Sequence, residues 1–173
     1  FVTIVLLSTG NSLPARVVIS SSDTAPNGGL FQLEKYEGMR VKVNSLTVVG
    51  PTEGNVTETS ATSTSTGYFY GVVTGVARPF REPGVQIPDP LPPGSPATVT
   101  RWDGNPELIA VASRGLFNGT FIDVASGAVL TNLIGPVVIS NRYYTINVDL
   151  PSTSPLPTIS NNNITFTAVP QQT

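Results

Sequence analysis

The sequence predicts an all-β protein, built either as an antiparallel β-sandwich or as a partly open OB-like barrel with a long proline-rich loop. Composition is the first observation: the chain has 173 residues, of which 39% are hydrophobic, with 16 glycines and 16 prolines. Such a composition favours turns and strands over long helices. The second observation is that the apolar residues form many short runs separated by turn-forming clusters, as in sandwiches and barrels. No run approaches the ~18 residues of a transmembrane helix, so we predict no membrane span.

The predicted strands are apolar or alternating runs bounded by glycine, proline, asparagine or serine. They are expected at residues 1–7, 16–20, 39–49, 67–76, 106–112, 121–124, 129–130, 134–140, 143–148 and 164–169. The clearest is 39–49, where Val41 and Val43 alternate with polar residues. This period of two is typical of a strand with one buried face.

Three other local features complete the predicted secondary structure. Residues 30–38 are expected to hold one or two helical turns that end at Gly38. The run of threonine, serine and alanine at 57–66 is either a flexible loop or a polar edge strand. Gly127 and Gly135 are expected at turns in the strand series before residue 140.

The proline-rich region raises the question of how many domains the chain contains. Residues 78–96 include seven prolines, which exclude a helix or a central strand and predict an extended loop. We predict a single all-β domain over 1–173. The alternative is a pair of sub-modules, 1–82 and 97–173, joined by the loop 83–96.

Both predicted terminal strands are apolar, so each must be covered. They either pair within the sheets of their own domain or complete the sheet of a neighbouring chain by strand addition. The assembly candidates are Phe1, Val2, Ile4, Leu6, Ile164, Phe166 and Val169. The first residue is Phe1, so we expect a processed product or part of a longer chain. Residues 1–7 lack the basic segment and cleavage site of a signal peptide.

Several classes of function are excluded by residues that the sequence lacks. It has no histidine and no cysteine, so catalysis by an imidazole or a thiol is impossible and no disulfide forms. Because no spacing of its carboxylates marks a catalytic pair, we predict that the chain is not an enzyme and needs no cofactor. The net charge of −2 argues against strong non-specific binding to nucleic acid. The scarcity of lysine among many threonines, serines and asparagines favours an extracellular or cell-surface protein.

One segment has a weak calcium-binding pattern. Asp103, Asn105 and Glu107 place oxygen-bearing side chains at alternate positions, and Ca²⁺ requires several oxygen ligands. The segment lacks the acidic density of a calcium loop, and Gly104 with Pro106 is ordinary turn chemistry. A plain turn is therefore the expected alternative.

A second pattern is the proximity of arginines to aromatic residues. Cations beside aromatic platforms hold single-stranded nucleic acid on OB-type sheets. The candidates are Arg78, Arg81, Arg101, Trp102, Arg142, Tyr143 and Tyr144. The segment 78–142 contains five arginines and five acidic residues, so salt bridges and core packing are the alternative interpretation.

Several motifs resemble a known family. They lie at residues 7–15 (LSTGNSLPA), 33–41 (LEKYEGMRV), 46–49 (LTVV), 71–84 (GVVTGVARPFREPG), 101–107 (RWDGNPE) and 127–136 (GAVLTNLIGP). Together they resemble the non-catalytic, β-rich and OB-like region of large secreted bacterial nucleases with an endonuclease/exonuclease/phosphatase catalytic domain. The resemblance implies a catalytic domain outside this chain, after about residue 173. The motifs consist of glycines, prolines and core residues, so no catalytic residue carries over.

We therefore expect a non-catalytic extracellular module that scaffolds a secreted nuclease or presents nucleic acid weakly to it. The alternative is a structural subunit of an extracellular filament or surface assembly, formed by β-strand exchange through the terminal strands. A fibre subunit would polymerise through these strands, whereas an accessory module would be monomeric on its own.

Overall fold

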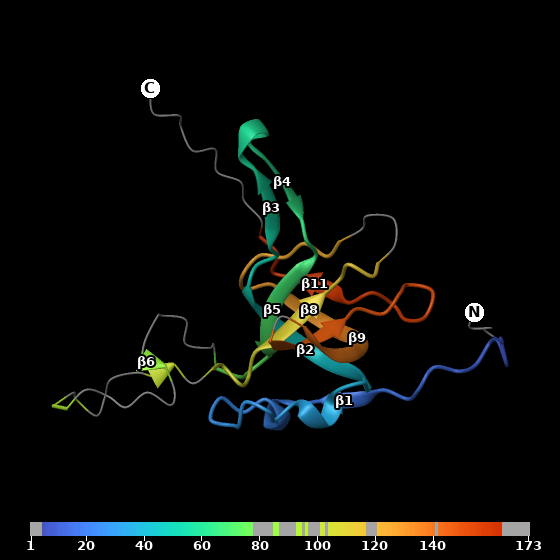
Figure 1. Ribbon diagram of the computed structural model, residues 1–173, viewed down its shortest axis with the longest axis horizontal. Helices are drawn as coiled ribbons and strands as arrows, with labels where there is room; N and C mark the ends of the chain where they lie inside the picture. Colours follow the sequence, from blue (N-terminus) through green and yellow to red (C-terminus); the bar gives the residue numbers. More distant parts are fainter. Residues whose placement is uncertain are drawn as a thin grey trace.

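The fold of this chain is a closed five-stranded β-barrel with additional strands, seen in a computed structural model (Figure 1). The structure describes residues 5–77, 85–86, 93–94, 96, 101–102, 104–116, 121–140 and 142–163. Its strands are β1 (Val17–Ile19), β2 (Arg40–Gly50), β3 (Gly54–Thr57), β4 (Thr62–Ser65), β5 (Tyr68–Val73), β6 (Val85–Gln86), β7 (Arg101–Trp102), β8 (Ile109–Ala112), β9 (Val129–Ser140), β10 (Tyr143–Asn147) and β11 (Thr158–Ser160). The prediction of an all-β, OB-like barrel is confirmed.

The order of the strands around the barrel is β2-β5-β8-β10-β9, and β9 returns to β2. The long strand β2 closes the barrel because it pairs with β9 from Arg40 to Thr47 and with β5 from Leu46 to Gly50. The barrel is therefore closed rather than partly open. It is also not wholly antiparallel, since β8 and β10 run parallel. The strands β2 and β5 precede the proline-rich segment and β8 to β10 follow it, yet all five share one sheet.

The core of the barrel is built by the alternation that predicts β2. Val41, Val43, Leu46 and Val48 point inward and are almost completely buried. Inward-facing residues of the other barrel strands complete one cluster with them, including Phe69 of β5. Arg40, Lys42 and Asn44 alternate with them and are more exposed, as period two requires, whereas the alternation changes phase between Val43 and Leu46 and the strand ends in buried residues.

Of the two glycines expected at turns before residue 140, one lies in a turn and the other does not. Gly127 lies in a turn with φ +91°, as expected. Gly135 does not, because β9 continues through it as a single strand of 12 residues. A Cβ atom at this position would collide with the backbone carbonyl of Asn147, at the end of β10. Gly135 is therefore required by a close approach of two strands rather than by a turn. The strand expected at 121–124 is absent, and these residues form an irregular segment.

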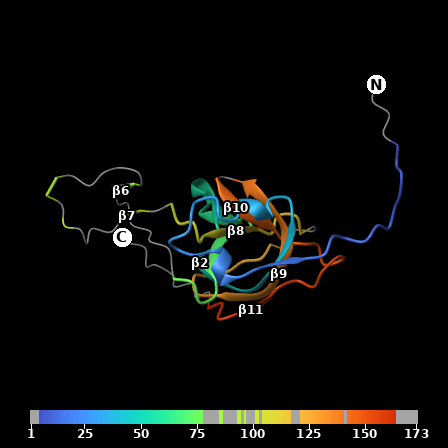
Figure 2. The same ribbon diagram turned by 90° about the horizontal axis from the view of Figure 1, so that it is seen from below.

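The N-terminal segment differs from its prediction. Residues 5–7 belong to no strand, and Leu6 and Leu7 are 77% and 91% exposed, so the expected buried strand is wrong there. The segment leads away from the barrel (Figure 2) and joins it at β1, which runs parallel to β2. A buried strand requires a partner, and the described residues provide none for 5–7. The other assembly candidates (Phe1, Val2, Ile4, Ile164, Phe166 and Val169) lie outside the described residues.

The serine- and threonine-rich run is divided between a 3-10 turn at Glu58–Ser60 and an edge strand. Residues 62–65 are β4, which pairs with β3 as a hairpin that projects from the barrel (Figure 1). Nearly all of its side chains are exposed. Most of the proline-rich region lies outside the described residues. The residue pair Val85–Gln86 forms β6, which runs parallel to β7.

The helical turn expected at 30–38 is present as the 3-10 turn Glu34–Tyr36, and Gly38 follows it with φ +75°. A second 3-10 turn covers Ser21–Asp23. Within the described parts of the chain, no helix has the length and apolar character needed to cross a membrane.

An ion pair between these two turns predicts how stability depends on pH. Lys35 Nζ lies 2.8 Å from Asp23 Oδ1, and Ser20 donates hydrogen bonds of 2.9 and 2.6 Å to Oδ2. Partial burial alone would raise the pKa of Asp23, but these hydrogen bonds outweigh it and hold the pKa well below its usual 3.8. The folded protein thus binds this proton less tightly than the unfolded chain. The resulting stabilisation is present above about pH 4 and lost as the pH falls below it.

Urea unfolding at about pH 7 and about pH 3 should therefore show a smaller acid-induced loss of stability for Asp23→Asn than for the wild type. Both proteins lose the contributions of the other carboxylates alike. The difference between their two acid-induced losses of stability therefore measures the contribution of Asp23. An identical loss in the two proteins would contradict a role for Asp23 in this dependence.

Candidate functional site

A pocket of about 470 Å³ opens at one end of the barrel. Its volume lies within the range of small-molecule sites. Three parts of the chain form it: the segment before the Glu34–Tyr36 turn, the loop that leads into β8, and the β9–β10 turn with the first residues of β10. The lining residues are Leu30, Phe31, Gly104, Asn105, Pro106, Leu108, Ile139, Arg142, Tyr143 and Tyr144.

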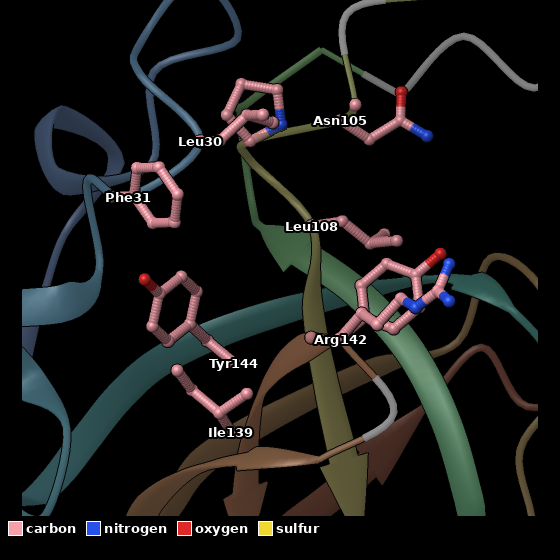
Figure 3. Close-up of a pocket in the computed structure, with 10 residues that line it drawn as sticks. Leu30, Phe31, Asn105, Leu108, Ile139, Arg142 and Tyr144 are labelled. Carbon is pink, nitrogen blue, oxygen red and sulfur yellow. The ribbon is translucent and has the colours of Figure 1, made fainter.

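The β9–β10 turn presents the cation of the pocket. Ser140 pairs with Tyr143, so the two strands are joined by a two-residue turn whose second residue is Arg142. Arg142 has φ +71°, the left-handed region that turns of this kind usually fill with glycine or asparagine. An arginine here is held against its backbone preference. Figure 3 shows its side chain and that of Leu108 on one side of the pocket, with Phe31 and Tyr144 on the other.

Aromatic rings form the facing wall. Phe31 is 76% exposed, and Figure 3 shows its ring on the same side of the pocket as that of Tyr144. The Tyr144 hydroxyl donates a hydrogen bond of 2.6 Å to Glu34 Oε2. Burial and this hydrogen bond raise the pKa of Tyr144 to about 12. The hydroxyl is therefore neutral at physiological pH, and its proton is already engaged by Glu34.

Tyr143 connects the pocket to a row of tyrosines on the outside of the barrel. Its ring centroid lies 5.3 Å from that of Tyr70, which lies 5.3 Å from that of Tyr68, both in edge-on geometry. The rings cover the small residues Ala110 and Ala112 of β8. Tyr70 donates a hydrogen bond of 2.8 Å to Glu53 Oε1, and burial together with this bond raises its pKa. Tyr143 and Tyr70 are half-buried and Tyr68 is only 4% exposed, so the part of this row that faces solvent is the part next to the pocket.

The loop before β8 is joined to the N-terminal wall of the pocket. Gln32 Nε2 donates a hydrogen bond of 2.7 Å to the carbonyl of Pro106. Gly104 has φ +82°, and its α-carbon lies so close to the Leu30 side chain that a Cβ atom would collide with it. These contacts fix the distance between the two walls.

The structure brings together only some of the residues that the sequence singles out. Three nucleic-acid candidates, Arg142, Tyr143 and Tyr144, line the pocket, as does the calcium candidate Asn105. The other nucleic-acid candidates are not placed: Arg78 and Arg81 lie outside the described residues, and Arg101 and Trp102 are described only as the backbone of β7.

The remaining calcium candidates are Asp103 and Glu107, and the calcium site stays a prediction. Asp103 lies outside the described residues, and Glu107 is only 3% exposed. Among the residues that the structure describes, no three acidic, histidine or cysteine side chains cluster as metal ligands.

Sequence reasoning missed the apolar half of the pocket. Leu30, Phe31, Leu108 and Ile139 come from three distant segments, and their meeting depends on the closure of the barrel. One local signal was available, because Leu30 and Phe31 form an apolar pair directly after two glycines in a polar stretch. Both side chains are more than half exposed, which is unusual for neighbouring large apolar residues.

The left-handed conformation of Arg142 leads to a stability prediction. Replacing it with glycine removes the conformational strain, because glycine adopts a positive φ without steric cost. We expect Arg142→Gly to unfold at an unchanged or higher urea midpoint, with a gain of up to about 1 kcal/mol. A loss of more than about 1 kcal/mol would show that the side chain supports the fold and is not free to serve a ligand.

The pocket thus combines three aromatic rings, an aliphatic floor and one guanidinium, an arrangement suited to a flat ligand that carries negative charge. No family model matches the sequence, and neither the curated proteins nor the solved structures gave a match.

Proposed function

We propose that this chain is a non-catalytic extracellular module that binds single-stranded nucleic acid weakly, as the accessory region of a secreted nuclease whose catalytic domain lies elsewhere. The observation that carries the proposal is the convergence of Arg142, Tyr143 and Tyr144 in one pocket of an OB-like barrel. The resemblance of several sequence motifs to such nucleases supports the biological setting.

The chemistry of the pocket suits single strands. Nucleobases stack on aromatic side chains whatever their sequence, and a nearby arginine neutralises the phosphate. OB barrels commonly bind oligonucleotides on the sheet face and at the loops that this pocket and the tyrosine row occupy. Stacking contributes about 1–3 kcal/mol per base, so two bases supply about 2–6 kcal/mol, which corresponds to a dissociation constant between roughly 40 µM and roughly 30 mM. Weak binding also agrees with the net charge of −2.

Binding should be tested by fluorescence anisotropy with a labelled single strand of roughly ten nucleotides, over a range of salt concentrations. Each phosphate contact contributes a slope of about −0.7 in the double-logarithmic plot. Arg142→Gln should weaken binding and reduce the slope by about 0.7. Arg16→Gln is the matched control, because it removes the same charge from an exposed residue that does not line the pocket. Equal effects of the two variants, or no binding, would contradict the proposal.

A second candidate function is a filament subunit assembled by strand exchange. It is favoured by one observation: Leu6 and Leu7 are exposed and belong to no strand, so this apolar segment is not covered by the described part of its own chain. Light scattering and negative-stain microscopy of the intact chain and of a variant lacking residues 1–7 would test it. Filaments that disappear on deletion would support the assembly, whereas monomers in both samples would contradict it.

A further inference from the structure

Resting on the function proposed above, we infer that the pocket holds one unpaired nucleotide. Its base would lie over Leu108 beside Phe31 and Tyr144, and its phosphate beside Arg142. The proposed function requires only that a single strand binds. The inference adds one subsite in which a single nucleotide has a fixed orientation.

The size of the pocket limits the ligand to a single unit. A volume of about 470 Å³ accommodates one small-molecule ligand. A base that remains paired in a duplex cannot enter a pocket of this kind, because it must first leave the stack. The pocket should therefore accept a base from a single strand or a strand end and should reject a continuous duplex.

The chemistry of the lining favours a nucleobase over a sugar. The floor and one wall are apolar, formed by Leu108, Leu30 and Phe31. The hydroxyl of Tyr144 is engaged by Glu34, so it does not offer its proton to a ligand. A saccharide carries many hydroxyl groups that need partners, and those that face the apolar floor and wall would be left unpaired at a cost. A nucleobase instead presents two flat faces that suit aromatic walls.

The charges around the pocket set the orientation. Figure 3 shows Arg142 on the side of the pocket opposite Phe31 and Tyr144. Glu34 lies on the Tyr144 side, where it accepts the hydrogen bond from that residue. A phosphate is attracted to the guanidinium and repelled by this carboxylate. The base must then occupy the aromatic side, and the phosphate the side of Arg142.

The path of the strand beyond this nucleotide follows from Tyr143. This residue lines the pocket and also touches Tyr70, at 5.3 Å between ring centroids. A strand that leaves the pocket past Tyr143 therefore runs onto the outer face of β5 and β8. The pocket would hold one end of such a strand.

Saturation-transfer NMR with adenosine monophosphate tests the subsite, with ribose 5-phosphate as the ligand that lacks a base. We expect the nucleotide to bind with strong transfer to the base protons, and the sugar phosphate to bind at least five-fold more weakly. Phe31→Ala should weaken nucleotide binding at least five-fold, because stacking on an aromatic residue is lost. Leu13→Ala is the control, since it also truncates a half-exposed apolar residue but does not line the pocket. Tyr144→Phe keeps the ring and should retain binding.

The outcomes separate this inference from the function on which it rests. If single-stranded DNA binds in a manner that depends on Arg142 while adenosine monophosphate does not bind, the single-nucleotide subsite is wrong and the proposed function stands. If neither ligand binds, both are wrong. If a neutral oligosaccharide such as maltohexaose binds the wild type and this binding is lost in Phe31→Ala, the pocket is a carbohydrate site. Both the nucleotide subsite and the proposed function are then overturned.

Discussion

Replacing Gly135 with alanine should destabilise the barrel by about 3 kcal/mol or more, or prevent its folding. The added Cβ would collide with the backbone carbonyl of Asn147, which belongs to the neighbouring strand β10. A flexible side chain could turn aside, but a strand carbonyl can move only with its strand. The two strands would have to separate where Gly135 also pairs with Val41 of β2. The urea midpoint of unfolding, with the m-value, measures this cost.

Gly115→Ala is the matched control, because a Cβ there meets no atom within 4 Å and the residue has no left-handed φ. This variant should be neutral or more stable by up to about 1 kcal/mol, since alanine reduces the freedom of the unfolded chain. Should the two variants unfold at the same urea concentration, the close approach at Gly135 would not exist in solution.

The second large effect is expected at the buried ion pair between Arg40 and Asp149. Arg40 donates bonds of 2.9 Å from Nε and 2.7 Å from Nη2 to one carboxylate oxygen, and a further bond of 2.8 Å to Ser154 Oγ. The side chains of the two charged residues are only 13% and 10% exposed. Arg40→Ala would leave the carboxylate buried without its cation. A loss of about 3–5 kcal/mol is expected, because an uncompensated buried charge is more costly than the pair itself.

A double-mutant cycle distinguishes this cause from lost packing. Arg40→Met keeps most of the aliphatic stem but leaves the carboxylate of Asp149 without a cation. Asp149→Leu removes that carboxylate. The double variant should be clearly more stable than the sum of the two single losses, by about 1–3 kcal/mol. Strict additivity in urea unfolding would mean that the two side chains do not interact.

Local pattern predicts the strands of this barrel better than it predicts their connections. The alternation around Val41 and Val43 identifies β2 because the signal lies within the strand itself. Gly127 and Gly135 look alike in the sequence, since both interrupt apolar residues. Only the folded structure distinguishes them: Gly127 lies in the turn before β9, whereas Gly135 allows β9 and β10 to approach each other. At residues 5–7 the local pattern predicts a strand that is absent. The apolar run there has no partner strand among the described residues.

The candidate site likewise has one part that the local sequence predicts and one part that only the fold brings together. Arg142, Tyr143 and Tyr144 are adjacent, so one stretch of sequence presents them together. Phe31 and Leu108 reach the same pocket only because β2 and β8 start at that end of a closed barrel. Their distance along the chain hides this relation. The strained turn at Arg142 is likewise visible only in the backbone, although it distinguishes this arginine from the others described.

The closure of the barrel through β2 and β9 also determines when the protein can fold during its synthesis. The strand Arg40–Gly50 is made early, but its partner is complete only after Ser140. At about 5–20 residues per second, β2 waits roughly 5 to 20 seconds with an unpaired edge. Such an edge invites pairing with other chains, and charged residues within a strand reduce that risk. Arg40 and Lys42 stand in this strand and are expected to keep the nascent chain from aggregating until β9 arrives.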